Sequence, residues 1–189
     1  MIKSDIDAYF HALSLEWSYP TRIILNGDAY AHILTKAKVG DDLSFEIKTV
    51  HIQKLVNALF QIGHRLNLQV DFTENIQNGS PITYLDYRSH LRPYKSFKNI
   101  KVFLLHPSYW SLGKIVRYHD QDIMEMISVF EKWRPGESAL AALWKQAMDA
   151  SPKSTTLYQI PKSAFHFFRK YGVTVWGKGF SLNRIMEYF

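Results

Sequence analysis

The chain has 189 residues, of which 47% are hydrophobic and 15% aromatic, so it can form the core of one domain or of a domain with a small appendage, and it is not disordered. A formal net charge of +6, from 23 Lys and Arg against 17 Asp and Glu, suits an anionic partner such as a nucleotide or nucleic acid. The absence of cysteine excludes disulfide frameworks and cysteine-based metal sites.

The chain shows no targeting or membrane signal. Its first residues, MIKSDIDAYF, lack the apolar run of a signal peptide. No segment approaches the roughly 20 apolar residues that a transmembrane helix needs. We therefore expect a cytoplasmic protein with no membrane partner.

The N-terminal half predicts three helices that alternate with three strands. Apolar residues recur at helical spacing in the first and third helices, and polar and apolar residues alternate in the second strand. Asp28 follows an Asn26-Gly27 turn, where it can accept hydrogen bonds at the N-terminus of the second helix. The expected helices are residues 2–17, 28–38 and 50–67, and the expected strands are residues 21–27, 41–50 and 68–74.

The C-terminal half predicts one strand followed by helices. Gly79, Pro81 and Pro93 indicate a loop over residues 75–96. The next segment, 99–106, is apolar on both faces, as in an interior strand. Helices are expected at residues 111–130, as one long helix or two short ones, at 136–150 and at 161–176.

Strands early and helices late predict an α+β fold, in which helices back a small mixed sheet and the C-terminal part is helical. We expect residues 1–107 to form the α/β core, including the N-terminal helix. Residues 108–189 are expected to form a helical part packed on that core.

The segment from Gly27 to Ser44 resembles the motif of the nucleotidyltransferase-like superfamily. That motif is a glycine followed by glycine or serine, a spacer, and two carboxylates one residue apart on a strand. Here Gly27 is followed by Asp28, thirteen residues and then Asp42-Leu43-Ser44, a spacing at the upper limit of the family. Two positions depart from the motif, because Asp28 replaces the small residue and Ser44 replaces the second carboxylate.

The later half is similar to minimal bacterial nucleotidyltransferase-like proteins related to AbiEii-type toxins. In those proteins a strand like FKNIKVFLLHP leads into a helix with a Lys, an Arg three residues on, and acidic residues after it. Lys114, Arg117, Asp122 and Glu125 match that arrangement, and FFRKYGVTVWG looks like the end of such proteins. The resemblance covers residues 22–176 and implies the nucleotidyltransferase fold for the core.

The resemblance also implies a reaction. Proteins of this family transfer a nucleotide from a nucleoside triphosphate to a protein or RNA acceptor, with Mg²⁺ ions that stabilise the attacking and leaving oxygens. By this likeness Asp42 and Asp71 would be the catalytic metal ligands. Glu46, on the same strand face but about 13 Å from Asp42 along the strand, is a further metal candidate. The implied nucleotide-binding residues are Gly27, Asp28, Ser44, Lys114 and Arg117.

The two departures from the motif leave two functional hypotheses open. Ser44 offers a neutral hydroxyl in place of a carboxylate, which weakens metal binding, and Asp28 would repel a phosphate at the helix N-terminus. The protein is then either a minimal metal-dependent nucleotidyltransferase or an inactive relative that binds a nucleotide, RNA or a protein partner. Ser44 favours the second hypothesis. A toxin-like role in a bacterial defence module rests on family analogy alone.

Simpler interpretations of the same residues also stay open. Asp42 and Ser44 fit an exposed strand face, Asp71 fits a strand end, and Asp28 fits a helix N-terminus. The stripe of Lys114, Arg117, Gln121 and Glu125 is either the solvated side of a helix or a surface that faces a ligand. The basic and aromatic last helix packs in a core or binds nucleic acid, and the scattered histidines have no metal-binding spacing. The enzyme hypothesis depends on Asp42, Asp71, Lys114 and Arg117 facing one cleft.

Overall fold

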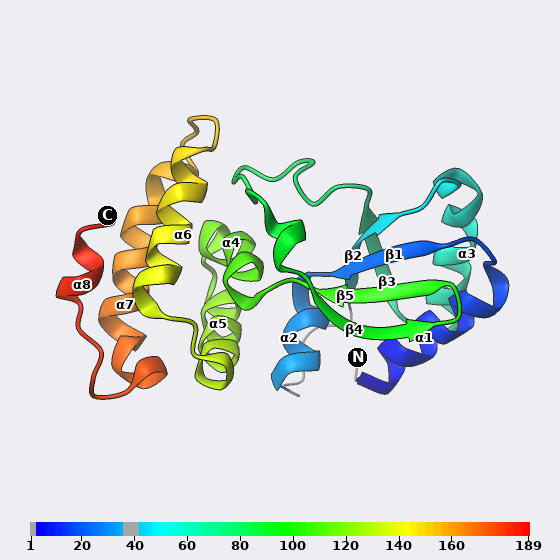
Figure 1. Cartoon of the computed structure of the whole chain (residues 1–189), viewed down its shortest axis with the longest axis horizontal. Helices are drawn as coiled ribbons and strands as arrows, with labels where there is room; N and C mark the ends of the chain where they lie inside the picture. The colour runs from blue at the N-terminus through cyan, green and yellow to red at the C-terminus, as the bar shows by residue number, and fades with distance from the viewer. Residues whose placement is uncertain (1–2, 36–41) are drawn as a thin grey trace. The chain divides into compact units, whose positions relative to one another are not determined.

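A computed structural model of the chain describes residues 3–35 and 42–189 (Figure 1). These residues form a five-stranded mixed sheet and eight α-helices, which confirms the α+β class. The chain divides into two compact units. The sheet unit comprises Met1–Asn78 and Arg88–Leu105, and the helical unit comprises Gly79–Tyr87 and His106–Phe189.

The sheet unit contains every helix and strand that the N-terminal half predicts, within a few residues at each end. The predicted second helix continues to residue 38, and its last three residues lie outside the described residues. The elements are α1 Lys3–Glu16, β1 Thr21–Leu25, α2 Gly27–Thr35, β2 Asp42–Lys48, α3 Ile52–Arg65, β3 Gln69–Thr73, the 3₁₀ helix η1 Tyr87–His90, β4 Arg92–Phe97 and β5 Ile100–Leu104.

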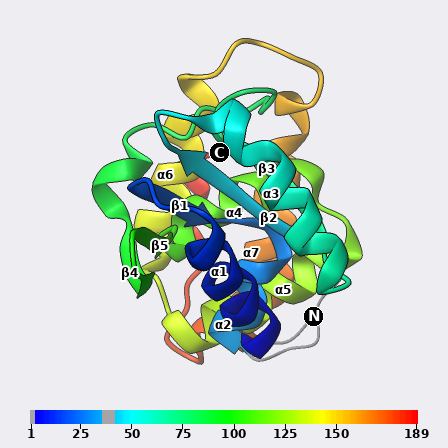
Figure 2. The same ribbon diagram turned by 90° about the vertical axis from the view of Figure 1, so that its right-hand side faces the viewer.

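The strands follow the order β3-β2-β1-β5-β4. β1 runs antiparallel to β2 and parallel to β5, while β2 and β3 are parallel and β4 and β5 antiparallel. Helices α1 and α3 pack together, and Figure 2 shows them crossing in front of the strands. Tyr9 Oη donates a hydrogen bond to the carbonyl oxygen of Leu59, and the ring of Phe10 packs edge-on against Phe45 of β2. The core of the unit therefore lies between these two helices and one face of the sheet.

The predicted loop over residues 75–96 is wrong at its C-terminal end, because residues Arg92–Phe97 form β4. This strand pairs with β5 through a hairpin whose turn holds Lys98 at a φ of 49°. Pro93 argued against a strand in the sequence because it has no N–H to donate. β4 lies at the edge of the sheet, where proline is tolerated, and the register shifts between Pro93 and Lys95.

The helical unit contains α4 Pro107–Arg117, α5 Asp120–Trp133, α6 Glu137–Asp149, the 3₁₀ helix η2 Leu157–Gln159, α7 Ile160–Trp176 and α8 Asn183–Met186. The predicted segment 111–130 is therefore two helices. They separate at Tyr118, which adopts a left-handed conformation with a φ of 50°. The N–H of His119 then donates to the Asp122 carboxylate at the start of α5.

The core of the helical unit is aromatic. Trp144 of α6 is fully buried, lies against the rings of Phe167 and Phe168 of α7, and donates from Nε1 to Ser111 Oγ at 2.9 Å. These two phenylalanines are buried whereas Arg169 and Lys170 are exposed, so the apolar side of the last long helix packs in the core. No helix within the described residues is long and apolar enough to cross a bilayer.

Candidate functional site

Three of the predicted motif positions lie in succession across the sheet unit. Gly27, the first residue of α2, has a φ of +56°, and a Cβ at this position would lie 3.1 Å from the Ser44 Cβ. Glycine is therefore favoured both by the left-handed backbone and by the close approach to β2. Ser44 in turn pairs with Asp71 across β2 and β3. Gly27, Ser44 and Asp71 therefore lie next to one another across α2, β2 and β3.

Asp42 and Asp71 flank Ser44 on one face of the sheet. Asp42 lies two residues before Ser44 on β2, and alternate residues of a strand project to the same face. Asp71 lies on that face because it is the register partner of Ser44. Both carboxylates belong to exposed residues, whereas Ser44 is half-buried. The face therefore presents two carboxylates and a central hydroxyl.

Asp28 lies in the first turn of α2, directly after Gly27. A negative side chain in the first turn interacts favourably with the partial positive charge of the helix N-terminus. This placement agrees with the simpler interpretation, in which Asp28 stabilises the N-terminus of α2. It puts a carboxylate next to the turn at which the family resemblance would place a phosphate.

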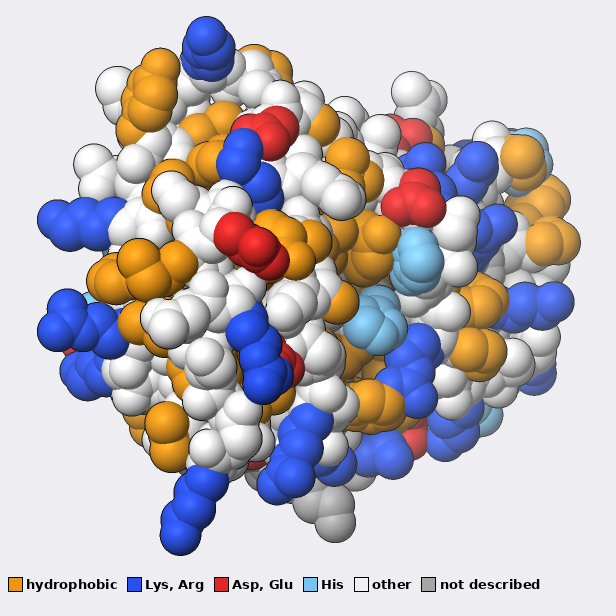
Figure 3. All heavy atoms as spheres, turned by 60° about the vertical axis from the view of Figure 1, so that its left-hand side comes forward, with side chains coloured by type: hydrophobic (Ala, Val, Ile, Leu, Met, Phe, Trp, Pro, Cys, Tyr) orange, Lys and Arg blue, Asp and Glu red, His pale blue; other side chains and the backbone are white. Residues whose placement is uncertain are grey.

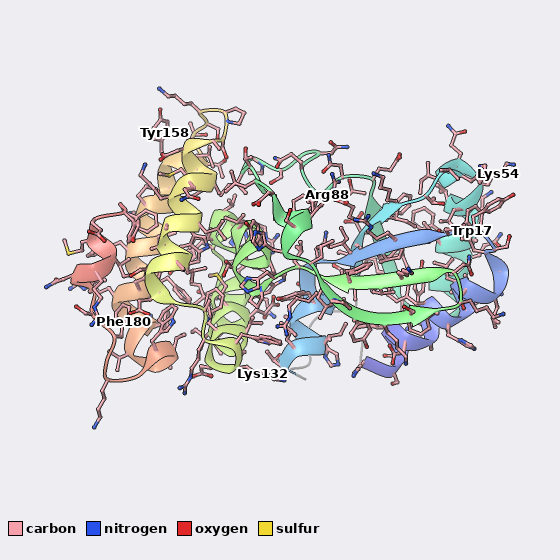
Figure 4. The ribbon with its side chains drawn as sticks, viewed as in Figure 1. Trp17, Lys54, Arg88, Lys132, Tyr158 and Phe180 are labelled. Carbon is pink, nitrogen blue, oxygen red and sulfur yellow. The ribbon has the colours of Figure 1, made fainter. Side chains whose placement is uncertain are left out.

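Glu46 has a structural role in the sheet unit. Its side chain is 2% exposed, Oε1 lies 2.9 Å from Nη2 of Arg88, and Oε2 accepts a hydrogen bond from the N–H of Ile76 at 2.8 Å. Figure 4 shows Arg88 on the short helix η1, which follows the segment that contains Ile76. Both carboxylate oxygens are thus engaged, and Glu46 connects the turn at Ile76 and the 3₁₀ helix η1 to β2.

Replacing Glu46 with Ala is expected to lower the free energy of unfolding by about 2–3 kcal/mol, because it removes charge-assisted hydrogen bonds from a buried position. Glu16→Ala is the matched control, since Glu16 makes an exposed ion pair with Arg65 whose loss costs less than about 1 kcal/mol. Equilibrium urea denaturation measures both effects. Equal losses in the two variants would contradict the anchoring role of Glu46.

The described residues do not fit the Mg²⁺ site that the resemblance implies. Within residues 3–35 and 42–189, no group of three or more His, Asp or Glu side chains is placed to hold a metal ion. The carboxylate of Glu46 is already held by Arg88 and a backbone N–H. Ser44 supplies a neutral hydroxyl between Asp42 and Asp71, where a third anionic ligand would be needed.

Lys114 is buried inside the helical unit, with 2% of its surface exposed. Its Nζ lies 2.5 Å from Glu125 Oε2, an ion-pair contact without hydrogen-bond geometry, and 3.2 Å from Asp122 Oδ1. The same ammonium lies 5.4 Å from the centre of the Trp110 ring. The polar stripe of the sequence is therefore neither a solvated face nor an open ligand surface at Lys114. It is the contact between α4 and α5.

Arg117 completes this ion cluster at the edge of the helix pair. Its Nη2 lies 2.6 Å from Asp122 Oδ1, and its side chain is half-exposed. Burial by itself raises the pKa of Asp122, but the hydrogen bond and charge of Arg117, the charge of Lys114 and the N–H of His119 outweigh it. The pKa of Asp122 is consequently below its ordinary value of 3.8, so the carboxylate stays charged at neutral pH.

The ion cluster changes what the predicted phosphate-binding pair can do. The charge of Lys114 is already neutralised by two buried carboxylates, so it does not attract a phosphate in this arrangement. Lys114 and Arg117 belong to the helical unit, whereas Asp42 and Asp71 belong to the sheet unit. A cleft shared by these four residues stays a prediction.

The sheet unit carries a row of three cations that the sequence pattern does not reveal: Lys48, Arg22 and Lys101, which we call the cationic row. Arg22 of β1 pairs in register with Lys48 of β2 on one side and with Lys101 of β5 on the other. All three residues are exposed. The only signal in the sequence was a single cation inside each of two apolar strands, TRIIL and IKVFL. Their alignment depends on the strand order, which the sequence pattern does not give.

The family models, the curated proteins and the solved structures contain no match to this chain. Two of its features bear on function: the Gly27–Ser44–Asp71 succession and the cationic row.

Proposed function

We propose that this chain is a catalytically inactive nucleotidyltransferase-like protein that binds a nucleotide at the Gly27–Ser44–Asp71 positions. The supporting observation is the succession of these residues. The glycine turn contacts β2 at Ser44, and Ser44 lies opposite Asp71, so the three residues lie next to one another. The element order α1-β1-α2-β2-α3-β3 supplies the same core plan.

Two features favour binding over transfer. Ser44 occupies the position of a metal-binding carboxylate, and Glu46, the next acidic residue on that strand face, is held by Arg88 and Ile76. A hydroxyl and a carboxylate on neighbouring strands form hydrogen bonds with sugar hydroxyls or base N–H groups, without metal ions. We therefore assign Ser44 and Asp71 to contacts with the nucleoside part of the ligand.

The test of this proposal measures binding and transfer side by side. Each radiolabelled nucleoside triphosphate is incubated with the protein and Mg²⁺, alone and with total RNA. We expect saturable binding that weakens about tenfold in Asp71→Ala, as for the loss of one charge-assisted hydrogen bond, and no label transfer. Asn57→Ala, an exposed position on α3, is the control and should bind as the wild type does.

A gain-of-ligand variant tests the family geometry separately. Ser44→Asp places a third carboxylate beside Asp42 and opposite Asp71, so this variant is expected to bind Mn²⁺, detectable by electron paramagnetic resonance, more tightly than the wild type. If the wild-type protein transfers label and the Asp42→Ala substitution abolishes this transfer, the enzyme hypothesis replaces the binding proposal. No binding of any nucleotide would overturn the proposal altogether.

A further inference from the structure

Three cations lie directly opposite one another on neighbouring strands of the sheet unit. Lys48, Arg22 and Lys101 are register partners across β2, β1 and β5. Register partners project to the same face, and adjacent strands lie about 4.8 Å apart, so the backbone positions of the row span about 10 Å. Like charges placed directly opposite across strands destabilise a sheet. The electrostatic repulsion within the cationic row therefore lowers the stability of the sheet, and the packing of the sheet unit does not require cations at these three positions.

No acidic side chain within the described residues forms an ion pair with any member of the row. Glu46, which lies two residues before Lys48 on β2, is held by an ion pair with Arg88. The three cations thus remain available to an external anion. Figure 3 shows one face of the molecule, on which Lys and Arg side chains are more frequent than Asp and Glu side chains, in agreement with the net charge of +6.

The cationic row lines a hollow with a volume of about 420 Å³, which also includes Pro20, Asn99 and Phe103. Phe103 follows Lys101 by two residues on β5 and is half-buried, so part of its ring is available for contact. Tyr19, beside Pro20, is 39% exposed and packs edge-on against His51. Cations and partly exposed rings therefore occur together at this end of the sheet.

The rim of the hollow is held in place by hydrogen bonds. The side-chain Nδ2 of Asn99 donates to the backbone carbonyl oxygens of Trp17 and Tyr19, both at 2.7 Å. The backbone carbonyl oxygen of Asn99 accepts a hydrogen bond from the N–H of Thr21 at 3.0 Å. Trp17 Nε1 donates to Thr21 Oγ1 at 2.9 Å. A rim fixed in this way loses little conformational freedom when a ligand binds.

We propose that the cationic row binds the phosphate backbone of a single-stranded nucleic acid. Three cations in line match a chain of phosphates better than an isolated anion, and exposed ring faces stack on bases that are not paired. A sheet surface with cations and aromatic rings is suited to single strands, whose unpaired bases it can contact. The proposal uses other residues than the nucleotide-binding proposal and does not depend on it.

The test compares two variants that lose the same charge. The row variant combines Arg22→Gln, Lys48→Gln and Lys101→Gln, and the control variant combines Lys162→Gln, Arg169→Gln and Lys178→Gln, which are exposed positions of the helical unit. Fluorescence anisotropy measures the affinity for a labelled RNA of about 12 nucleotides, a typical site size. We expect the row variant to bind about tenfold more weakly or worse, and the control within about twofold of the wild type.

The salt dependence adds a second readout. With three phosphate contacts to a single strand, log Kd should change with log salt concentration by a slope of about 2, and the row variant should lose most of this slope. Removal of opposed like charges should leave the melting temperature of the row variant equal to or above that of the wild type. Weaker binding by that variant then reflects lost contacts and not unfolding.

Further ligands separate the sources of the anion. A single-stranded DNA of the same sequence should bind through the same row, and preference for RNA would indicate contacts to the 2′-hydroxyl. Equal losses in the row and control variants, or wild-type affinity in the row variant, would overturn the proposal. So would absence of RNA and DNA binding, tighter binding to the corresponding duplex, or row-dependent binding to vesicles of anionic lipid without binding to a single strand.

Discussion

Replacing Lys114 with Met is expected to lower the free energy of unfolding by about 3–5 kcal/mol, because removal of one partner leaves uncompensated buried charge. Lys114 is 2% exposed and contacts the carboxylates of both Asp122 and Glu125. Methionine keeps much of the length of the lysine stem, so the predicted loss comes mainly from the charge. Equilibrium urea denaturation measures the effect, and the dependence of the free energy of unfolding on urea concentration is compared between the variants.

Lys145→Met is the matched control for this prediction. Lys145 pairs with Asp149 at 2.5 Å, one turn apart on α6, and both side chains are exposed. The loss of such a helical pair changes stability by less than about 0.5 kcal/mol. Adding Glu125→Gln to Lys114→Met should restore part of the stability, since it removes one of the uncompensated carboxylates. A loss below about 1 kcal/mol in Lys114→Met would contradict a buried ion cluster.

Replacing Trp144 with Ala is expected to lower the free energy of unfolding by about 3–5 kcal/mol, as for other fully buried large aromatic residues. The indole lies between α6 and α7 and against the rings of Phe167 and Phe168. The variant also removes the only donor that reaches Ser111 Oγ among the hydrogen bonds described here. Thermal melting followed by circular dichroism, together with urea denaturation, measures the loss.

Tyr158→Ala is the control for Trp144, because Tyr158 is an aromatic residue of the same unit with 70% of its surface exposed (Figure 4). Its replacement should change stability by no more than about 0.5 kcal/mol. Trp144→Phe should fall between the two, since it keeps a ring in the core and loses the hydrogen bond to Ser111. Similar stability of Trp144→Ala and Tyr158→Ala would mean that Trp144 is not a core residue.

The environment of the polar stripe of residues 114–125 could not be predicted from the sequence pattern. Helical spacing of Lys114, Arg117, Gln121 and Glu125 fits a solvated face and a ligand-facing surface equally well. The break at Tyr118, which takes a left-handed conformation, turns α5 back against α4, so that Asp122 and Glu125 meet Lys114. A charge is paired or solvated according to what packs against it, and spacing along one helix does not specify that partner.

The elements that contain Gly27 and Ser44 were predicted more fully, because their geometry is mostly local. A glycine turn between a strand and a helix, and alternation along a strand, fix the positions of Gly27 and Ser44 through backbone conformation. The alternation also assigned Asp42, Ser44 and Glu46 to one strand face. The engagement of Glu46 could not be predicted in this way, since Arg88 lies 42 residues further along the chain.

The sequence by itself determined the α+β class, six helical segments and four of the five strands in the described residues, because hydrophobic periodicity is a property of short segments. It left open whether the segment 111–130 is one helix or two. Only the tertiary structure decided that Arg92–Phe97 is an edge strand, that Lys114 is buried in an ion cluster, and that Arg22, Lys48 and Lys101 form one row. Each of these depends on which strand or helix becomes the neighbour of another, and long-range pairing is set by the packing of the whole unit.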